Sequence, residues 1–274
     1  MITLIQISDC HLLKDKDKSG YDGIAPYYAL EDVLRDVSQT LRSARSLSGD
    51  SAIVLVTGDI SGDNSKESYT HFLTLMKQYI EAQGVSWFAI AGNHDNNVHF
   101  DSLLTDHILT AGSPIHSANW LIHGCDTRHP YDKHGAGGSV KQQDVIAIEK
   151  VCDANQAAQI PHHPLFHIVA LHHHVLPSQS WMDKHALAGA EYIEALVSRQ
   201  SGIKAVLHGH VHSPIRQHIG ERGTPSYGCP SSCWQWAMQE TFGTSEESPG
   251  YQQFTLCYDG TVEVNVRRVA YKTR

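Results

Sequence analysis

Short runs of apolar, largely β-branched residues recur along the chain and predict strands that are buried on both faces. Five of these runs occupy residues 2–7, 52–56, 85–90, 167–171 and 203–207. A further strand is predicted over residues 119–125. Runs of this length, separated by longer segments, are typical of a sheet whose parallel strands are connected by helices.

Apolar positions with helical spacing fill the first segments between strands. Residues 28–44 place an apolar face on one side of a helix, made of Leu30, Val33, Leu34, Val37, Leu41 and Ala44. In the next predicted helix, Asn64 is the expected N-cap, with Glu67 in the capping-box position. Its core face is predicted to comprise Tyr69, Phe72, Leu73, Met76, Tyr79 and Ile80.

Three further helices are predicted along the rest of the chain. The first covers residues 101–109 and is ended by Gly112. The second starts with Ser139 and Gln142 as its capping pair and runs through Val151. The third covers residues 189–199.

The C-terminal part is predicted to consist of strands and loops from Pro225 onward. Residues 251–258 and 261–270 are expected to form a hairpin, joined by a type I′ turn at Asp259-Gly260. The chain shows neither an internal repeat nor a linker, so residues 1–274 are expected to form a single domain. We predict an α/β fold, a four-layer α/β/β/α sandwich of two mixed β-sheets flanked by helices.

The composition, with 41% hydrophobic and 18% charged residues, is that of an ordinary soluble protein. A net charge of −8 gives no basic field, so neither a nucleic-acid nor a membrane partner is expected. No N-terminal signal is visible, and no apolar run approaches the ~20 residues of a membrane span. The six cysteines are expected to be reduced, buried thiols, and the protein is expected to be cytoplasmic.

Each of the five apolar runs ends in a polar cluster. The clusters are Ser8-Asp9-Cys10-His11, Thr57-Gly58-Asp59, Ala91-Gly92-Asn93-His94-Asp95, His172-His173-His174 and His208-Gly209-His210-Val211-His212. In α/β sheets the carboxyl ends of parallel strands form the ligand-binding edge, so we expect these side chains to meet there. The pair His162-His163 precedes a strand instead and is expected at the opposite edge.

Carboxylates, an amide and imidazoles make a donor set suited to manganese, iron or zinc. Seven such ligands are too many for one ion, whereas two ions that share a carboxylate fit the count. Two-metal sites with ions about 3.5–4 Å apart catalyse displacement at phosphorus.

The ordered set D-x-H, G-D, G-N-H-D, H and G-H-x-H resembles the calcineurin-like metallophosphoesterases, and the likeness extends over nearly the whole chain. The resemblance implies that Asp9, His11, Asp59 and His212 hold one metal, with Asp59 as the bridge. It implies that Asn93, His172 and His210 complete the other. The histidine triplet leaves His173 as the alternative to His172.

The chemistry implied by this resemblance is hydrolysis of a phosphate ester by a metal-bridging hydroxide that attacks phosphorus. Two ions, iron or manganese with zinc as the alternative, activate the water and neutralise the phosphate oxygens. His94 is the candidate general acid, and Asp95 is expected to orient it. Substrate contacts are expected from Asn93, His94 and His212.

Within the family, the chain is most similar to the bacterial class III 3′,5′-cyclic AMP phosphodiesterases. The further similarities are His172-His173-His174 with Leu176-Pro177, the stretch Ser180-Trp181-Met182-Asp183-Lys184-His185, the stretch Pro230-Ser231-Ser232-Cys233-Trp234-Gln235-Trp236, and Pro249-Gly250-Tyr251. Val175 and Cys10 depart from the family pattern, but neither supplies an expected ligand. A small cyclic nucleotide is therefore the expected substrate, hydrolysed to 5′-AMP by a monomer or homodimer.

Residues 231–251 are expected to line the nucleoside side of the pocket, with Trp234 or Trp236 against the base. Two other functions compete with this prediction. One is a broad-specificity phosphodiesterase or phosphatase, or a lipid-A-precursor pyrophosphatase, of the same fold. The corresponding motif of the lipid-A enzymes resembles G-N-R-D, with arginine at the position of His94. Arginine cannot serve as a general acid near neutral pH, which argues against this function. The other is a metal-free scaffold protein, which would have lost ligands that are all present here.

Overall fold

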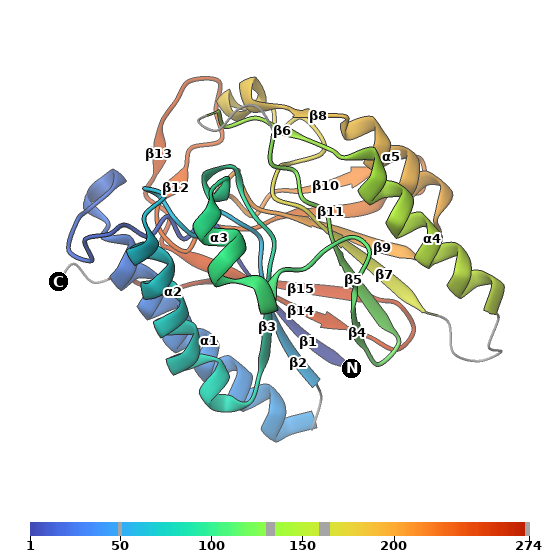
Figure 1. The fold of residues 1–274 in the computed structure, drawn as a ribbon, viewed down its shortest axis with the longest axis horizontal. Helices are drawn as coiled ribbons and strands as arrows, with labels where there is room; N and C mark the ends of the chain where they lie inside the picture. The colour runs from blue at the N-terminus through green and yellow to red at the C-terminus, as the bar shows by residue number, and fades with distance from the viewer. Residues whose placement is uncertain (49–50, 130–134, 159–164, 272–274) are drawn as a thin grey trace.

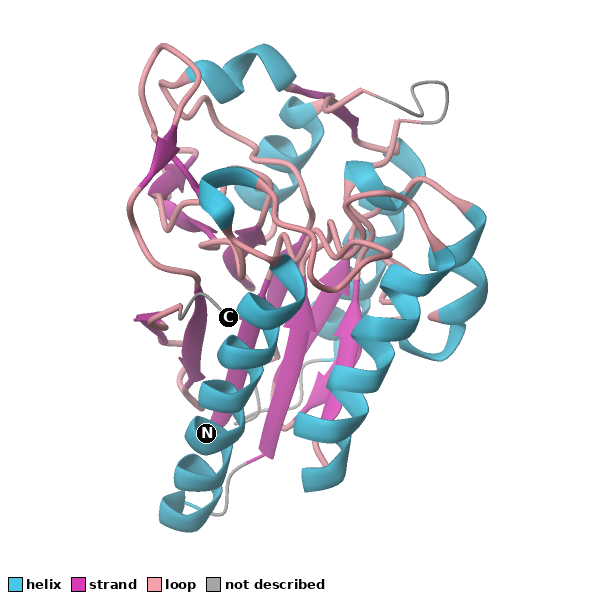
Figure 2. Ribbon diagram, turned by 90° about the vertical axis from the view of Figure 1, so that its left-hand side faces the viewer, coloured by secondary structure: helices cyan, strands magenta, loops and turns pink. Residues whose placement is uncertain are grey.

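The computed structural model describes residues 1–48, 51–129, 135–158 and 165–271. Two β-sheets pack face to face, and helices cover the outer face of each, with α1 and α2 on one side and α4 and α5 on the other (Figure 1). The same layers are seen from the side in Figure 2, with loops gathered at one end of the strands. The predicted four-layer α/β/β/α sandwich is confirmed.

The first sheet contains five strands in the order β15-β14-β1-β2-β3. They are β15 (Val262–Arg268), β14 (Gly250–Leu256), β1 (Ile2–Ile7), β2 (Ser51–Val56) and β3 (Ser86–Ala89). The strands β1, β2 and β3 are parallel, whereas β14 pairs with β1 in the antiparallel direction. The sheet is therefore mixed, and its parallel strands all end at the same edge.

The second sheet contains six strands in the order β10-β11-β9-β7-β5-β4. They are β10 (Arg216–Ile219), β11 (Thr224–Gly228), β9 (Ile203–His208), β7 (Phe166–Ala170), β5 (Trp120–Gly124) and β4 (Ile115–Ser117). The four central strands are parallel, and both edge strands are antiparallel to their neighbours. Two short pairs complete the described strands, β6 (Gly138–Ser139) with β8 (Leu187–Ala188) and β12 (Gln235–Trp236) with β13 (Thr244–Ser245).

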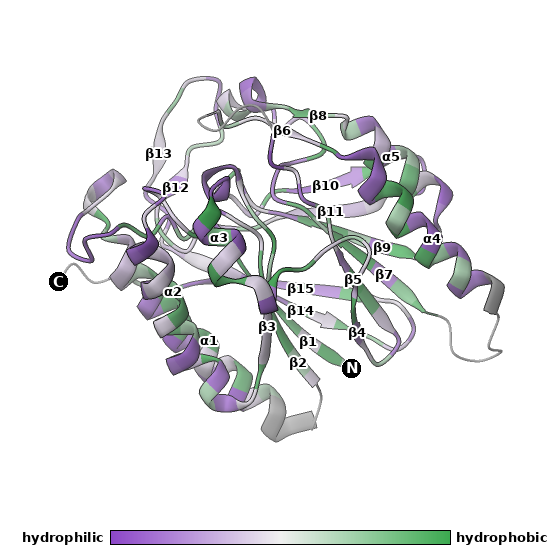
Figure 3. Cartoon of the chain, viewed as in Figure 1, coloured by the Kyte–Doolittle hydropathy of each residue, from purple (hydrophilic) through white to green (hydrophobic). Residues whose placement is uncertain are grey.

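The helices are α1 (Pro26–Ser48), α2 (Lys66–Tyr79), α3 (Val98–Leu103), α4 (Gln142–Ala158) and α5 (Ala190–Arg199). Their apolar faces form two of the three buried core layers, one under α1 and α2 and one under α4 and α5. The third layer lies between the sheets and includes Leu4, Ile168 and Phe254. The central strands are correspondingly apolar in Figure 3.

Several predicted helix boundaries were wrong. The N-cap of α2 is Ser65, whose side chain accepts from the Ser68 N–H, whereas Asn64 has a positive φ of 59° and bonds to Asn97. Helix α3 begins at Val98 with Asn97 as its cap and ends before a short 3₁₀ turn. Ser139 pairs in β6 instead of capping α4, and α4 continues beyond Val151 to Ala158.

The C-terminal hairpin is confirmed, but its turn is not type I′. The Gly260 N–H donates to the Cys257 carbonyl, and the Cys257 N–H donates to the Thr261 carbonyl. Gly260 has a φ of 89°, whereas Asp259 is not among the residues with positive φ. This is the pattern of a three-residue loop, a type I turn followed by a left-handed glycine.

The loops after β1, β2, β3, β7 and β9 meet at the edge formed by the carboxyl ends of the strands. The pair His162-His163, predicted for the opposite edge, lies outside the described residues. Among the helices of the described ranges, none is long and apolar enough to cross a bilayer. The described cysteines are all free thiols, and all but Cys257 are buried.

Candidate active site

Backbone hydrogen bonds hold the polar loops of the two sheets against one another. The Asp9 N–H donates to the Gly58 carbonyl at 2.9 Å, which joins the loops after β1 and β2. The Gly209 N–H donates to the His172 carbonyl at 3.0 Å, which joins the loops after β9 and β7. Side chains that lie more than two hundred positions apart in sequence are thereby brought to one place.

Five predicted ligands adopt left-handed backbone conformations. They are Asp9, His11, Asp59, His210 and His212, with φ between 47° and 68°. Nine non-glycine residues of the described ranges have positive φ, so more than half of them belong to this cluster. Such conformations are unfavourable for ordinary residues and concentrate at functional sites, where the surrounding structure enforces them.

Two glycines of the motifs allow the loops to approach closely. A Cβ atom on Gly92 would collide with the Asp59 carboxylate, and one on Gly209 would collide with the Ser8 hydroxyl. Only glycine therefore permits the third and fifth motifs to pack against the first two.

One group of donors comes from the loops after β1, β2 and β9. Asp9, His11 and His212 offer donor atoms that lie within 4.8 Å of one another. The Nε2 atoms of His11 and His212 are 3.1 Å apart, and His212 Nε2 is 3.4 Å from Asp9 Oδ1. His11 Nε2 also lies 3.7 Å from Oδ2 of Asp59.

A second group of donors lies on the other side of Asp59. Its Oδ2 atom is 3.4 Å from Nε2 of His172, which is 3.1 Å from Oδ1 of Asn93. The His210 ring lies beside His172, with centroids 5.2 Å apart, and its buried Nε2 has no hydrogen-bond partner within the described part of the chain. Asp59 thus lies between the two groups.

The geometry favours His172 over His173 as the ligand from the triplet. Nε2 of His172 faces Asp59 and Asn93, whereas Nδ1 of His173 is 2.7 Å from the Thr127 hydroxyl. His173 remains close to His210, with ring centroids 4.7 Å apart.

The buried carboxylates attract positive charge. Burial raises the pKa of Asp9 and Asp59, but His212 beside Asp9 and His172 beside Asp59 lower both below the ordinary value. Burial lowers the pKa of His172, but Asp59, Asp9 and the Thr57 carbonyl raise it to about 9. A proton on His172 therefore supplies charge that a metal cation would otherwise provide.

The donor set fits metal ions. Nδ1 of His172 lies 2.7 Å from the Thr57 carbonyl oxygen, and Nδ1 of His212 lies 2.9 Å from the Trp234 carbonyl oxygen. These carbonyls accept from Nδ1–H and leave Nε2 of each ring free to bind a metal. Burial lowers the pKa of His11 to about 3, so this imidazole is neutral, as a ligand must be.

His94 lies at the edge of the cluster, half-buried. Its ring stands edge-on to His11, with centroids 4.9 Å apart, and its backbone N–H donates to Asp59 Oδ1 at 2.9 Å. Its position is thus set by the loop that also fixes Asp59.

The predicted pairing of Asp95 with His94 is wrong. The Asp95 carboxylate accepts from the N–H groups of Ile60, Ser61 and Gly92 and from the Tyr69 hydroxyl. The tight turn over Asn93–Asp95 directs this side chain back toward Gly92 and away from His94. Asp95 therefore positions the loops that carry Asp59 and Asn93.

Replacing Tyr69 with phenylalanine is expected to lower the free energy of unfolding by about 1.5–3 kcal/mol, the usual value of a hydrogen bond to a charged group. The hydroxyl donates to Asp95 at 2.7 Å inside the protein. Tyr79→Phe is the control, because that hydroxyl bonds to Glu31 in a less buried position. Urea unfolding measures both variants, and equal losses would contradict the role given to Asp95.

A cleft of about 590 Å³ opens beside His11 and His94. Its walls are aromatic, with Tyr21, Trp181, Trp234, Trp236 and Phe242, and Lys18 and Lys184 also line it. The Trp234 ring stacks on His11, and the Trp236 ring stacks on His212.

Phe242 belongs to the segment 231–251 that was predicted to line the pocket, and it lines this cleft. Sequence reasoning did not single out Tyr21 or Trp181 as residues of the cleft. Trp181 lies in the S-W-M-D-K-H stretch, whose likeness to the family was the available signal. Tyr21 comes from a segment without any periodic pattern, so residue spacing did not reveal its place in the cleft.

Comparisons with known proteins show which family and which relatives the chain resembles. The sequence profile of the calcineurin-like phosphoesterase family matches residues 2–214. A 3′,5′-cyclic-nucleotide phosphodiesterase of Nostoc is 27% identical, with 98% of this chain and 93% of the relative covered. The 3′,5′-cyclic adenosine monophosphate phosphodiesterase CpdA of Escherichia coli K12 is 26% identical, with 98% and 90% covered.

Among solved structures, a dimetal phosphatase from Danio rerio is similar in fold. Its TM-score is 0.64 at 15% sequence identity, and the match covers 98% of this chain and 99% of that one.

Proposed function

The chain belongs to the calcineurin-like phosphoesterase family, and from that membership we propose that it is a metal-dependent phosphodiesterase that hydrolyses 3′,5′-cyclic AMP to 5′-AMP. The relatives named as cyclic nucleotide phosphodiesterases support this substrate class, because they match nearly the full chain.

One observation carries the proposal. The cluster of carboxylate, amide and imidazole donors directly adjoins an aromatic cleft, and His11 and His94 belong to both. A phosphate bound at the donor cluster would therefore have its organic substituent within reach of the aromatic walls. This arrangement suits a small phosphodiester with a flat base.

We assign Asp9, His11, Asp59 and His212 to one metal ion, and Asp59, Asn93, His172 and His210 to a second. The donors are nitrogen and oxygen, which suits iron or manganese, with zinc as the alternative. When bound, such ions lower the pKa of a coordinated water and neutralise charge on the phosphate.

The protein's own groups then orient and protonate the substrate. The backbone N–H of His94 fixes the Asp59 carboxylate, and the Thr57 and Trp234 carbonyls fix the tautomers of His172 and His212. The half-buried His94 ring donates a proton to the leaving 3′-oxygen, which would otherwise depart as a poorly stabilised alkoxide. Asn93 and His212 border the volume in which the phosphate would lie.

We infer that the aromatic cleft binds the base, with Trp181 as a wall. Its ring packs against Trp236 and Phe242, with centroids 5.4 Å and 4.9 Å away. Buried indole nitrogens normally donate a hydrogen bond, but Nε1 of Trp181 and of Trp234 has no partner within the described ranges.

Trp181→Ala is expected to raise KM for cyclic AMP about tenfold, because stacking on a base contributes roughly 1–3 kcal/mol. Hydrolysis of bis(p-nitrophenyl) phosphate should change little, since that diester has no nucleobase. Steady-state kinetics on both substrates measure the effect. Trp234→Ala and Trp236→Ala should impair both reactions, because their rings stack on predicted ligands.

Tyr258→Ala is the matched control for Trp181→Ala. Tyr258 is 63% exposed in the turn between β14 and β15, at the opposite end of the first sheet. If Trp181→Ala impairs both substrates alike, Trp181 is a structural residue and the base lies elsewhere.

A substrate panel tests the proposed function. Metal-reconstituted protein is assayed with 3′,5′-cyclic AMP, 3′,5′-cyclic GMP, 2′,3′-cyclic AMP and the nitrophenyl diester. The highest kcat/KM is expected for 3′,5′-cyclic AMP, with 5′-AMP as product. Equal values for all four would instead identify a broad-specificity phosphodiesterase.

A further inference from the structure

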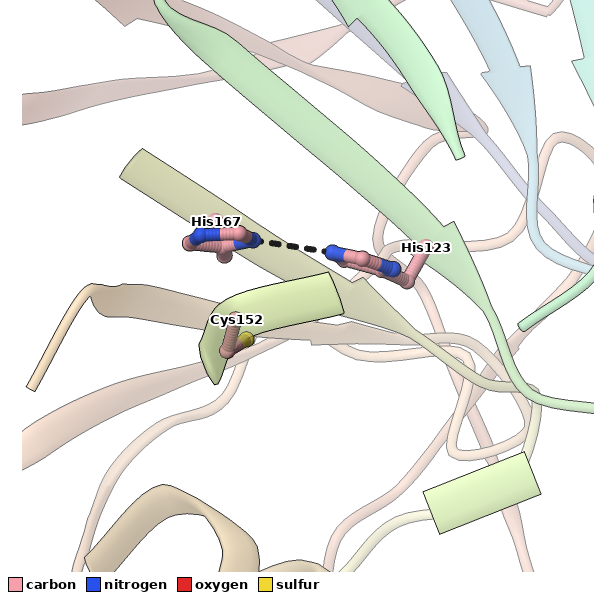
Figure 4. Close-up of side chains that lie close together, drawn as sticks. All are labelled: His123, Cys152 and His167. Carbon is pink, nitrogen blue, oxygen red and sulfur yellow. Dashed lines mark hydrogen bonds between the residues drawn. The ribbon is translucent and has the colours of Figure 1, made fainter. Parts of the chain in front are cut away.

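A second group of metal-binding side chains lies beneath helix α4, away from the candidate active site. His123 of β5, His167 of β7 and Cys152 of α4 point toward one another (Figure 4). Their exposed fractions are 0%, 2% and 1%, so all three side chains are buried. Their donor atoms all lie within 4.8 Å of one another.

The strand register places the two histidines together. Leu121 pairs with His167 and His123 pairs with Val169, so both imidazoles are on the same face of the sheet. That face otherwise packs apolar residues such as Val169 and Leu171 against α4 and α5. A buried thiol is common in such a core, but two adjacent imidazoles in this layer depart from the pattern that a purely structural core would follow.

An irregularity of the sheet occurs at the same point. The pairing between β7 and β9 shifts register between His167 and Ile168. Such bulges redirect a side chain relative to a regular strand and are found beside functional sites. The extra residue is Lys204 of β9, which lies opposite the step from His167 to Ile168. Nδ1 of His167 lies 3.0 Å from Nε2 of His123.

The protonation states suit metal binding. Burial, and the neighbouring His167, lower the pKa of His123 to about 4 despite the Ala111 carbonyl, and burial lowers that of His167 to about 4. Both rings are therefore neutral at pH 7, and one N–H lies between the two facing nitrogens. Burial raises the pKa of the Cys152 thiol to about 12, so this thiol keeps its proton until a cation binds.

We propose that His123, His167 and Cys152 bind one divalent transition-metal ion of the zinc class, separate from the predicted catalytic ions. Two imidazoles and a thiolate are the donors that zinc prefers, and water can take the fourth position. Tetrahedral bonds of about 2.05 Å would place the two nitrogens about 3.3 Å apart. The 3.0 Å separation needs to widen only slightly.

Binding releases one proton for each ion. The Cys152 thiol loses its proton to solvent and becomes the thiolate ligand. The proton between the two imidazoles moves to the outer nitrogen of its own ring, so both facing nitrogens present lone pairs. No oxidation or reduction is involved.

The ion would fasten α4 to the second sheet. His167 precedes His172 by five residues, which corresponds to roughly 15 Å of extended strand, so the two sites do not share ligands. Because all three ligands are buried, loading requires folding around the ion or local opening. Removal of this ion by a chelator should therefore be slower than removal of the ions predicted for the candidate active site.

Cobalt(II) is the probe that separates the two sites. Thiolate ligation gives cobalt a near-ultraviolet charge-transfer band, whereas the predicted catalytic ligands are all nitrogen and oxygen. Chelated protein reconstituted with Co²⁺ should show this band, and Cys152→Ser should abolish it with the loss of one ion per chain. His123→Phe should likewise lose one ion.

Cys125→Ser is the matched control, since Cys125 is also buried in the layer under α4. It should keep both the band and the ion. A wild-type protein without the band, or equal ion counts in wild type and Cys152→Ser, would overturn the proposal. If Cys152→Ser fails to fold, the band and ion count of His123→Phe decide the matter.

Discussion

Asp59→Asn is expected to abolish hydrolysis, with a loss of at least about 10³-fold in kcat, and to lower bound metal. The carboxylate borders both donor groups, at 3.7 Å from His11 Nε2 and 3.4 Å from His172 Nε2. An amide carries no charge and offers one oxygen, so neither ion would be held or bridged as before. A loss of several kcal/mol of the transition-state stabilisation that the metal ions would provide corresponds to this loss of rate.

Asp63→Asn is the control for this variant. Asp63 lies four residues on, and its carboxylate accepts hydrogen bonds from the Lys14 N–H and from Ser65 in an exposed loop. Metal content and turnover should stay at the wild-type level. Wild-type metal content in Asp59→Asn, measured by elemental analysis, would show that Asp59 does not bridge.

His94→Ala should keep both ions and lower kcat on cyclic AMP by roughly 10²–10⁴, the usual contribution of general acid catalysis. The 3′-oxygen is a poor leaving group that needs a proton. The loss should be much smaller on a nitrophenyl diester, whose leaving group is stable as an anion. Parallel kinetics with the two substrates measure the difference.

Equal losses on both substrates would assign His94 a positional role. The distinction is clear here because the backbone N–H, which an alanine retains, fixes Asp59. Replacement therefore removes the ring without removing the contact that holds the Asp59 carboxylate.

The layers and the donor cluster were predictable because they follow from local patterns. Buried parallel strands are continuous apolar runs, and their carboxyl ends must share an edge. Asp9, His172 and His212 could therefore be placed near one another from the sequence alone. The left-handed backbone conformations at Asp9 and His212 could not be predicted, because they depend on tertiary packing that overrides local preference.

The errors share a physical cause. Asp95 was paired with its sequence neighbour His94, but the turn directs its carboxylate to distant N–H groups at Ile60 and Ser61. The N-cap of α2 is Ser65 and not the predicted Asn64, because Asn64 adopts a positive φ. Side-chain direction within a tight turn is not encoded in residue spacing.

Contacts between side chains from distant segments likewise could not be predicted from the sequence. Trp181 and Phe242 meet across 61 positions in the cleft wall. His123, Cys152 and His167 come from two strands and a helix, with no ligand spacing to reveal them. Only the folded arrangement brings such residues together.

The central claim, metal-dependent hydrolysis at a cluster that holds two ions, is tested most directly by a metal titration. Chelated Cys152→Ser protein, which lacks the additional proposed site, is titrated with Mn²⁺ while bound ions and 5′-AMP formation are measured together. The account predicts no hydrolysis without metal and full activity at two ions per chain. Full activity with one ion, or with none, would contradict it.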